Sequence, residues 1–302
     1  MKNLSEDTLF GFEFTFMDEN SEKIEEQCLI PDLNVWWEKI KNRIESYFSC
    51  LDISELSDCG INIAGLNDLK FKFHNNFWFK VSVDPRVVEV QTKPITLCEI
   101  ENTYSCIIQG IFDVFINTLK MEVGNGGGHV NVDYQTGFCS DFFKMKRMLV
   151  ASECYYMSSI KDKSGVNEVI DVTYISHDPF ISSDRIIKEN PNSKPKNYYS
   201  HWRNNVLVKD EKNFKEEHIK WLLNHPTDAQ DREFVLEGAD DTKRNRALHY
   251  QAVNIEHIFE ENPIERRLEF RFFKAQRNID DILECINIID HIKGISDRIK
   301  LL

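Results

Sequence analysis

The sequence predicts an α+β protein built on an antiparallel sheet with helices packed on its outer face. Residues 9–17 alternate apolar and polar side chains, as a half-buried strand does. Residues 69–92 contain further short alternating runs joined by turn residues, whereas helical periodicity is confined to separate segments. Because strands and helices do not alternate regularly, the pattern favours α+β over a doubly wound parallel sheet.

In the first half of the chain, the run LFGFEFTFM at 9–17 predicts a strand with one polar face. Apolar residues at helical spacing over 33–48 predict an amphipathic helix. Two alternating runs within 69–83, joined at a His-Asn-Asn turn, and a third at 86–92 predict an antiparallel meander. An apolar stripe over 99–119 predicts a helix that covers a sheet.

In the second half, residues 129–134 again alternate and predict a strand, and 142–160 read as a helix. The pattern weakens over 161–210, a polar stretch with several prolines that we interpret as a loop or flap inserted in the fold. The remaining predicted elements are a short helix at 216–223, short strands at 232–236, 248–254 and 267–273, and a C-terminal amphipathic helix at 279–299.

Composition limits the classes of partner. The chain has 302 residues, a length that allows one large domain or two smaller ones, and we expect a single domain over 1–302. The formal net charge is -13, so the long-range field repels phosphate backbones and anionic membranes. We therefore expect neither nucleic acid nor a membrane as partner, although a few arginines suffice to hold a nucleotide.

The cellular compartment is predicted from what the sequence lacks. The first residues do not follow the basic-then-apolar order of a signal peptide, and no run approaches 18 uncharged apolar residues. The eight cysteines show no CxxC or zinc-finger spacing, and most stand in apolar stretches where we expect small buried thiols. A cytoplasmic protein with reduced cysteines is expected.

Several predicted strands carry a polar residue among bulky apolar neighbours: Glu13, Glu89, His129, and Glu269 with Arg271. Taken singly, each is more typical of a solvated strand face. Taken together, they fit carboxylates and an imidazole that project from neighbouring strands and bind divalent cations. Two carboxylates about 4 Å apart repel by roughly 4 kcal/mol at an effective dielectric near 20, so such a cluster needs cations or protons. Oxygen ligands favour Mg²⁺, and one histidine makes Mn²⁺ acceptable.

Five segments in order, GFEFTF, VEVQTKP, GGGHVNVD, RNRALHYQAVNIEHI and RRLEFRFF, resemble the signature series of the amidoligase family. That family is a branch of the glutamine synthetase and glutamate-cysteine ligase superfamily of carboxylate-amine ligases. The resemblance covers residues 11 to about 278. It implies a curved sheet forming a catalytic funnel, with ATP at one end, the substrates at the other, and Mg²⁺ between them.

The resemblance also implies metal ligands. Glu13, His129 and Glu269 correspond to the residues that hold the metal bridging the nucleotide phosphates, and Glu89 corresponds to a ligand nearer the carboxyl substrate. Arg271 is similar to the arginine that contacts the transferring phosphate.

One further arginine completes the implied site: Arg244 or Arg246 is similar to the arginine that neutralises nucleotide phosphates. The implied reaction joins a carboxylate substrate to an amine substrate, each a small molecule, peptide or protein. The carboxylate attacks the γ-phosphate of ATP, and the amine then attacks the acyl phosphate to give an amide or isopeptide bond.

Two positions depart from the family pattern. Thr15 stands where the first strand commonly carries a second acid, and Asn131 stands where a second histidine is usual. Either fewer metal ions bind, or Asp133, Glu99 or water completes the site. Two alternatives therefore stay open: a catalytically degenerate binding module that keeps the amidoligase fold, and a phosphotransferase on the same fold.

Overall fold

The computed structural model describes residues 3–25, 33–49, 53–62, 64–84, 87–123, 128–145, 147–149, 151–152, 253–254, 256–271, 273 and 275–298. Two compact units divide the chain: Glu6–Asn131 with Phe273–Glu284, and Met1–Ser5 with Val132–Phe272 and Cys285–Leu302. A single domain over 1–302 stays a prediction. The predicted flap at 161–210, the elements predicted at 216–223 and 232–236, and Arg244 and Arg246 all lie outside the described residues.

Within the described residues the strands form one open sheet in the order β2-β3-β4-β5-β1-β8-β10-β9, and β6 and β7 pair with β1 off this path. Every pairing whose register is defined is antiparallel, so the mixed helix-and-strand class with an antiparallel sheet is confirmed. The strands are β1 (Leu9–Met17), β2 (Ile53–Ile61), β3 (Asn67–Phe73), β4 (Trp78–Asp84), β5 (Val87–Thr92), β6 (Ile95–Thr96), β7 (Glu122–Val123), β8 (His129–Asp133), β9 (Val253–Asn254) and β10 (Arg267–Phe270).

The predicted helices at 33–48, 99–119 and 279–299 are present. The middle one is a run of α and π segments, and the last ends at Ser296. Those of residues 142–152 that are described are helical, and the rest of the predicted 142–160 helix lies outside them. The helices are α1 (Glu19–Glu25), α2 (Leu33–Phe48), α3 (Leu97–Glu99), η2 (Ile100–Tyr104), α4 (Ser105–Phe112), η3 (Asp113–Thr118), α5 (Tyr134–Phe138), η7 (Glu256–Phe259), η8 (Pro263–Glu265) and α12 (Ile279–Ser296).

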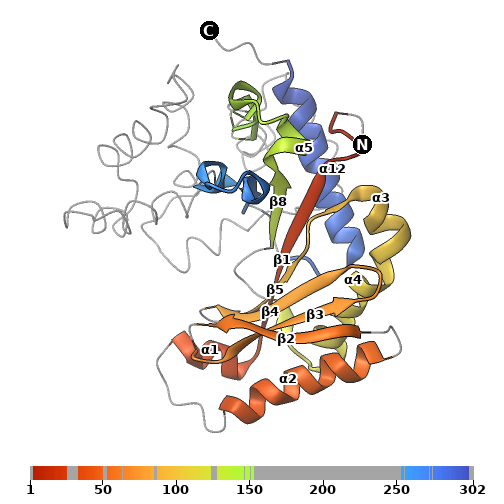
Figure 1. The fold of residues 1–302 in the computed structure, drawn as a ribbon, viewed down its shortest axis with the longest axis vertical. Coiled ribbons are helices and arrows are strands. Elements are labelled where there is room, and N and C mark those ends of the chain that lie inside the picture. The colour runs from red at the N-terminus through yellow and green to blue at the C-terminus, as the bar shows by residue number, and fades with distance from the viewer. Residues whose placement is uncertain are drawn as a thin grey trace, which may run out of the picture. The chain divides into compact units, whose positions relative to one another are not determined.

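In the unit that contains β1 to β5, strand alternation separates an apolar face from a polar one. The apolar face packs on helices: the ring of Phe14 lies 4.7 Å from that of Phe112, and Phe16 stacks on Phe115 at 4.4 Å. The helix α2 covers β3 and β4 through Phe48 (Figure 1). Because the helices occupy this face, the polar side chains of the same strands project from the other one.

The other unit holds the N-terminal residues against α12. The carboxylate of Asp290, a buried residue, accepts hydrogen bonds from the backbone N–H groups of Asn3 at 3.0 Å and Leu4 at 2.8 Å. The Asn3 side chain in turn donates to the Asp290 backbone carbonyl. A buried carboxylate needs such donors, so these bonds tie the start of the chain to this helix.

Some predictions were wrong. The strand β10 ends at Phe270, before the predicted end at 273, and Phe273 forms only an isolated bridge. The sequence did not predict β2, α1 or α5. In β2 the serines and acids interrupt apolar alternation, because this strand pairs along one side with β3 and leaves much of its surface to solvent. Four of the five cysteines in the described residues are exposed, against the prediction of buried thiols.

Candidate metal centre

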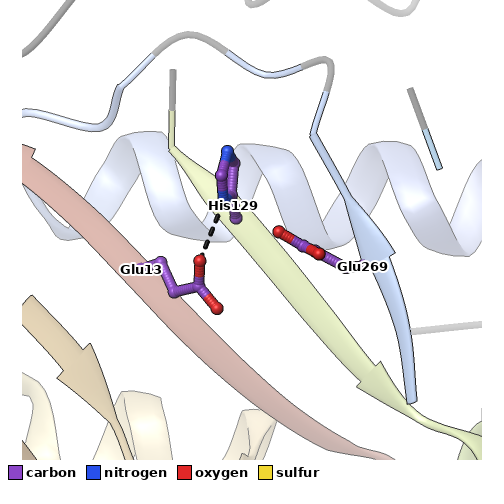
Figure 2. A group of neighbouring side chains, drawn as sticks. All are labelled: Glu13, His129 and Glu269. Carbon is purple, nitrogen blue, oxygen red and sulfur yellow. Dashed lines mark hydrogen bonds and ion pairs between the residues drawn. The ribbon is translucent and has the colours of Figure 1, made fainter. Parts of the chain in front are cut away.

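The first part of the site lies on β1 and β8. The Nδ1 atom of His129 lies 2.8 Å from Oε2 of Glu13 (Figure 2). The Asn131 side chain donates to Oε1 of Glu13 at 3.0 Å. His129 and Asn131 are two residues apart on one strand and therefore share a face. The side chains of Glu13 and His129 are only 14% and 12% exposed. Both oxygens of this carboxylate are thus held in place.

The second part lies on β9 and β10. Glu269 stands opposite Asn254 in the strand register, and the Asn254 side chain donates to its Oε2 at 2.8 Å. Arg271, two residues further on, donates to Oε1 at 3.1 Å. His257 approaches Oε2 at 3.9 Å through Nε2. Glu269 and Asn254 are both buried, so this carboxylate is a fixed and charge-compensated acceptor.

Glu13, His129 and Glu269 each offer one ligand atom, and these atoms lie within 4.8 Å of one another (Figure 2). Two atoms bound to one Mg²⁺ at about 2.1 Å are at most roughly 4.2 Å apart, so small side-chain shifts suffice for a common cation. Carboxylate oxygens with a single imidazole suit Mg²⁺ or Mn²⁺. The group is therefore chemically able to hold a divalent metal ion.

Glu89 lies beside this group and not in it. The register of the β1–β5 pair places Glu89 directly opposite Thr15, and both side chains are buried. Burial, and then the negative charges of Glu13 and Asp84, raise the pKa of Glu89 to about 8, against smaller opposing effects of His129 and Gln91. The Gln91 side chain donates to Oε1 of Glu89 at 2.5 Å. At neutral pH this carboxyl is therefore mainly protonated.

The polar face of β1 is not the half-buried, solvated surface that alternation predicted. Thr15 is buried, and the Asn131 side chain is hydrogen-bonded to Glu13. The two acids considered as replacement ligands cap helices: Asp133 accepts from the backbone N–H of Thr136 at 2.6 Å at the start of α5, and Glu99 forms a capping box with Thr96. Both carboxylates already satisfy helix N-termini.

Of the three predicted phosphate-binding arginines, Arg271 is described and contacts Glu269. Sequence reasoning missed His257, whose Nδ1 lies 3.1 Å from Oε1 of Glu260 and whose Nε2 faces Glu269. The sequence does place His257 three residues before Glu260, but this spacing is common in helical turns and does not by itself indicate a functional site.

Comparison of the chain with protein-family models, with curated protein sequences and with solved structures gives no match. Among the described residues, no helix is both long and apolar enough to span a membrane. Fold and site together define an α+β protein with an open antiparallel sheet and a Glu/His/Glu group that could hold a metal ion.

Proposed function

We propose that this protein is an ATP- and Mg²⁺-dependent carboxylate-amine ligase of the amidoligase kind, with Mn²⁺ as an acceptable substitute. One observation supports the proposal most: two carboxylates and an imidazole from strands far apart in sequence converge to within 4.8 Å. A lone polar residue on a strand needs no function, but convergence of two carboxylates costs free energy that a cation offsets.

Each residue has a role in this proposal. Glu13, His129 and Glu269 would hold the cation, which supplies charge neutralisation for the phosphates of ATP when it is bound. Glu13 is oriented by Asn131, and Glu269 by Asn254, so the ligands need little reorganisation.

The arginines would bind the nucleotide. Arg271 pairs with Glu269, and a guanidinium is the side-chain group best suited to forked contacts with phosphate oxygens. Arg244 or Arg246 would neutralise the other phosphates. The substrate carboxylate would attack the γ-phosphate, and attack of the amine on the acyl phosphate would release phosphate, with ADP released as the other product.

A second candidate, a binding module that keeps the fold without turnover, is favoured by the environment of Thr15. This position offers a neutral hydroxyl, its partner across the strands is the protonated Glu89, and Asp133 and Glu99 cap helices. Such a surface lacks the negative charge that a second cation near the carboxyl substrate requires.

An ADP-release assay with hydroxylamine as acyl-phosphate trap separates the two candidates. Wild type is incubated with ATP, Mg²⁺ and a panel of amino acids and amines, beside Glu269→Gln and the control Glu265→Gln, an exposed acid on η8. A ligase gives a hydroxamate in wild type and control and none in Glu269→Gln. ATP binding without ADP release over the panel would favour the binding module.

A further inference from the structure

Gly128, which precedes His129, is packed against a side chain from a distant part of the chain. A Cβ at Gly128 would overlap the carboxamide of Gln276, with the Cδ and Nε2 atoms 2.5 and 2.6 Å away. Gln276 is only 1% exposed, so its carboxamide has little space to retreat. Gly128 does not have a positive φ, so backbone strain is not the reason for a glycine here. The reason is steric, because Gln276 leaves no space for a Cβ.

The backbone is held at the same place. The N–H of Gly128 donates to the carbonyl of Phe273 at 3.3 Å. One residue further on, the imidazole of His129 contacts Glu13 at 2.8 Å. His129 is therefore fixed from two sides: its ring by Glu13 on β1, and the backbone before it by Phe273 and Gln276.

We propose that Gln276 is a positioning residue of the metal centre, acting through Gly128 to place the His129 imidazole. This inference rests on the proposed cation site and adds to it a residue that makes no contact with the cation. The carboxamide occupies the space that a Cβ at Gly128 would take, and so sets how closely the start of β8 approaches Phe273 and Gln276. Any side chain at Gly128 would displace His129 from Glu13.

The test is a compensating pair of substitutions, measured as binding of Mn²⁺ alone by calorimetry. Changes that misplace a metal ligand typically weaken metal binding 10- to 100-fold. Gly128→Ala is therefore expected to weaken Mn²⁺ binding at least about 10-fold. In Gly128→Ala/Gln276→Ala the overlap is removed, and affinity is expected to return to within about 3-fold of Gln276→Ala.

Two glycines provide matched controls. A Cβ at Gly11, two residues before Glu13, would meet Asn131 at 3.6 Å, an ordinary contact, so Gly11→Ala should bind Mn²⁺ normally. A Cβ at Gly110 would lie 2.9 Å from the rings of Phe48 and Tyr47, far from the site in sequence. Gly110→Ala should therefore lower the melting temperature without changing the affinity, which separates destabilisation from mispositioning.

The ring resonances of His129 in the metal-free protein provide a second measurement. They should shift in Gly128→Ala and return toward the Gln276→Ala values in the double variant, even if wild type binds no Mn²⁺ and the cation proposal fails. Normal Mn²⁺ affinity and unshifted resonances in Gly128→Ala would overturn the positioning role. The positioning role would also be overturned if the double variant showed the Mn²⁺ affinity and the His129 resonances of Gly128→Ala.

Discussion

Glu89 stands directly opposite Thr15 across the β1–β5 pair, and both side chains are buried. The carboxyl of Glu89 therefore faces a hydroxyl where a paired charge would be needed to stabilise its ionised form. Burial and the neighbouring acids Glu13 and Asp84 keep it protonated near neutral pH. A pH dependence of stability follows from the burial of Glu89 beside these acids.

The first prediction is that stability falls as pH rises between about 4.5 and 8. The pKa of Glu89 rises from 4.5 to about 8 on folding, so in this window the native state binds a proton that the unfolded state has lost. Denaturant unfolding at pH 5 and pH 8.5 measures the change. Glu89→Gln should reduce the loss of unfolding free energy between the two pH values. Glu55→Gln, a change of an exposed acid on β2, should leave that loss as it is in wild type. The same change in unfolding free energy with pH in wild type and both variants would contradict the role of Glu89.

The second prediction concerns the cation. Mg²⁺ or Mn²⁺ with nucleotide should raise the melting temperature, because a ligand bound only by the folded state stabilises it by about 2.7 kcal/mol at a hundredfold excess over Kd. In Glu269→Ala the shift should vanish, since one carboxylate of the group is lost. Glu265→Gln is the control. A shift of the same size in wild type and Glu269→Ala would place the cation elsewhere.

The third prediction is that Arg271→Lys is not a conservative change. The Arg271 guanidinium contacts Glu269 at 3.1 Å and is expected to contact phosphate oxygens in the forked geometry of a guanidinium, which lysine lacks. Turnover should fall about 100-fold with little change in melting temperature. Arg277→Lys, at an exposed arginine that pairs with Asp281, is the control. Lost stability with unchanged nucleotide affinity would make Arg271 purely structural.

The fourth prediction decides between ligase and binding module through Glu89. In a ligase this residue, which stands opposite Thr15, would replace the charge missing there, provided that the bound cation displaces its proton. Glu89→Gln should then abolish ADP release while ATP binding remains nearly intact, because Glu13, His129 and Glu269 are unchanged. A Glu89→Gln protein that releases ADP at the wild-type rate would remove Glu89 from the chemistry.

Local sequence pattern alone determined the elements whose apolar residues recur with a clear strand or helix period. The Phe residues of β1 recur with the two-residue period of a strand, and the apolar residues of α2 recur with the period of a helix. Turn residues between two alternating runs marked the connection of β3 to β4. The same logic failed for β2, because that strand holds its place by pairing with β3 and not by burying an apolar face.

For the site, the sequence by itself determined that polar residues stand on strands, and hence which residues share a face with Glu13 or with His129. Only the tertiary structure decided which of them meet. Residues 13, 129 and 269 approach one another because of the strand order, which depends on contacts between distant segments. The neutral state of Glu89 and the packing of Gln276 on Gly128 likewise depend on burial among groups from other strands and loops, which no local pattern records.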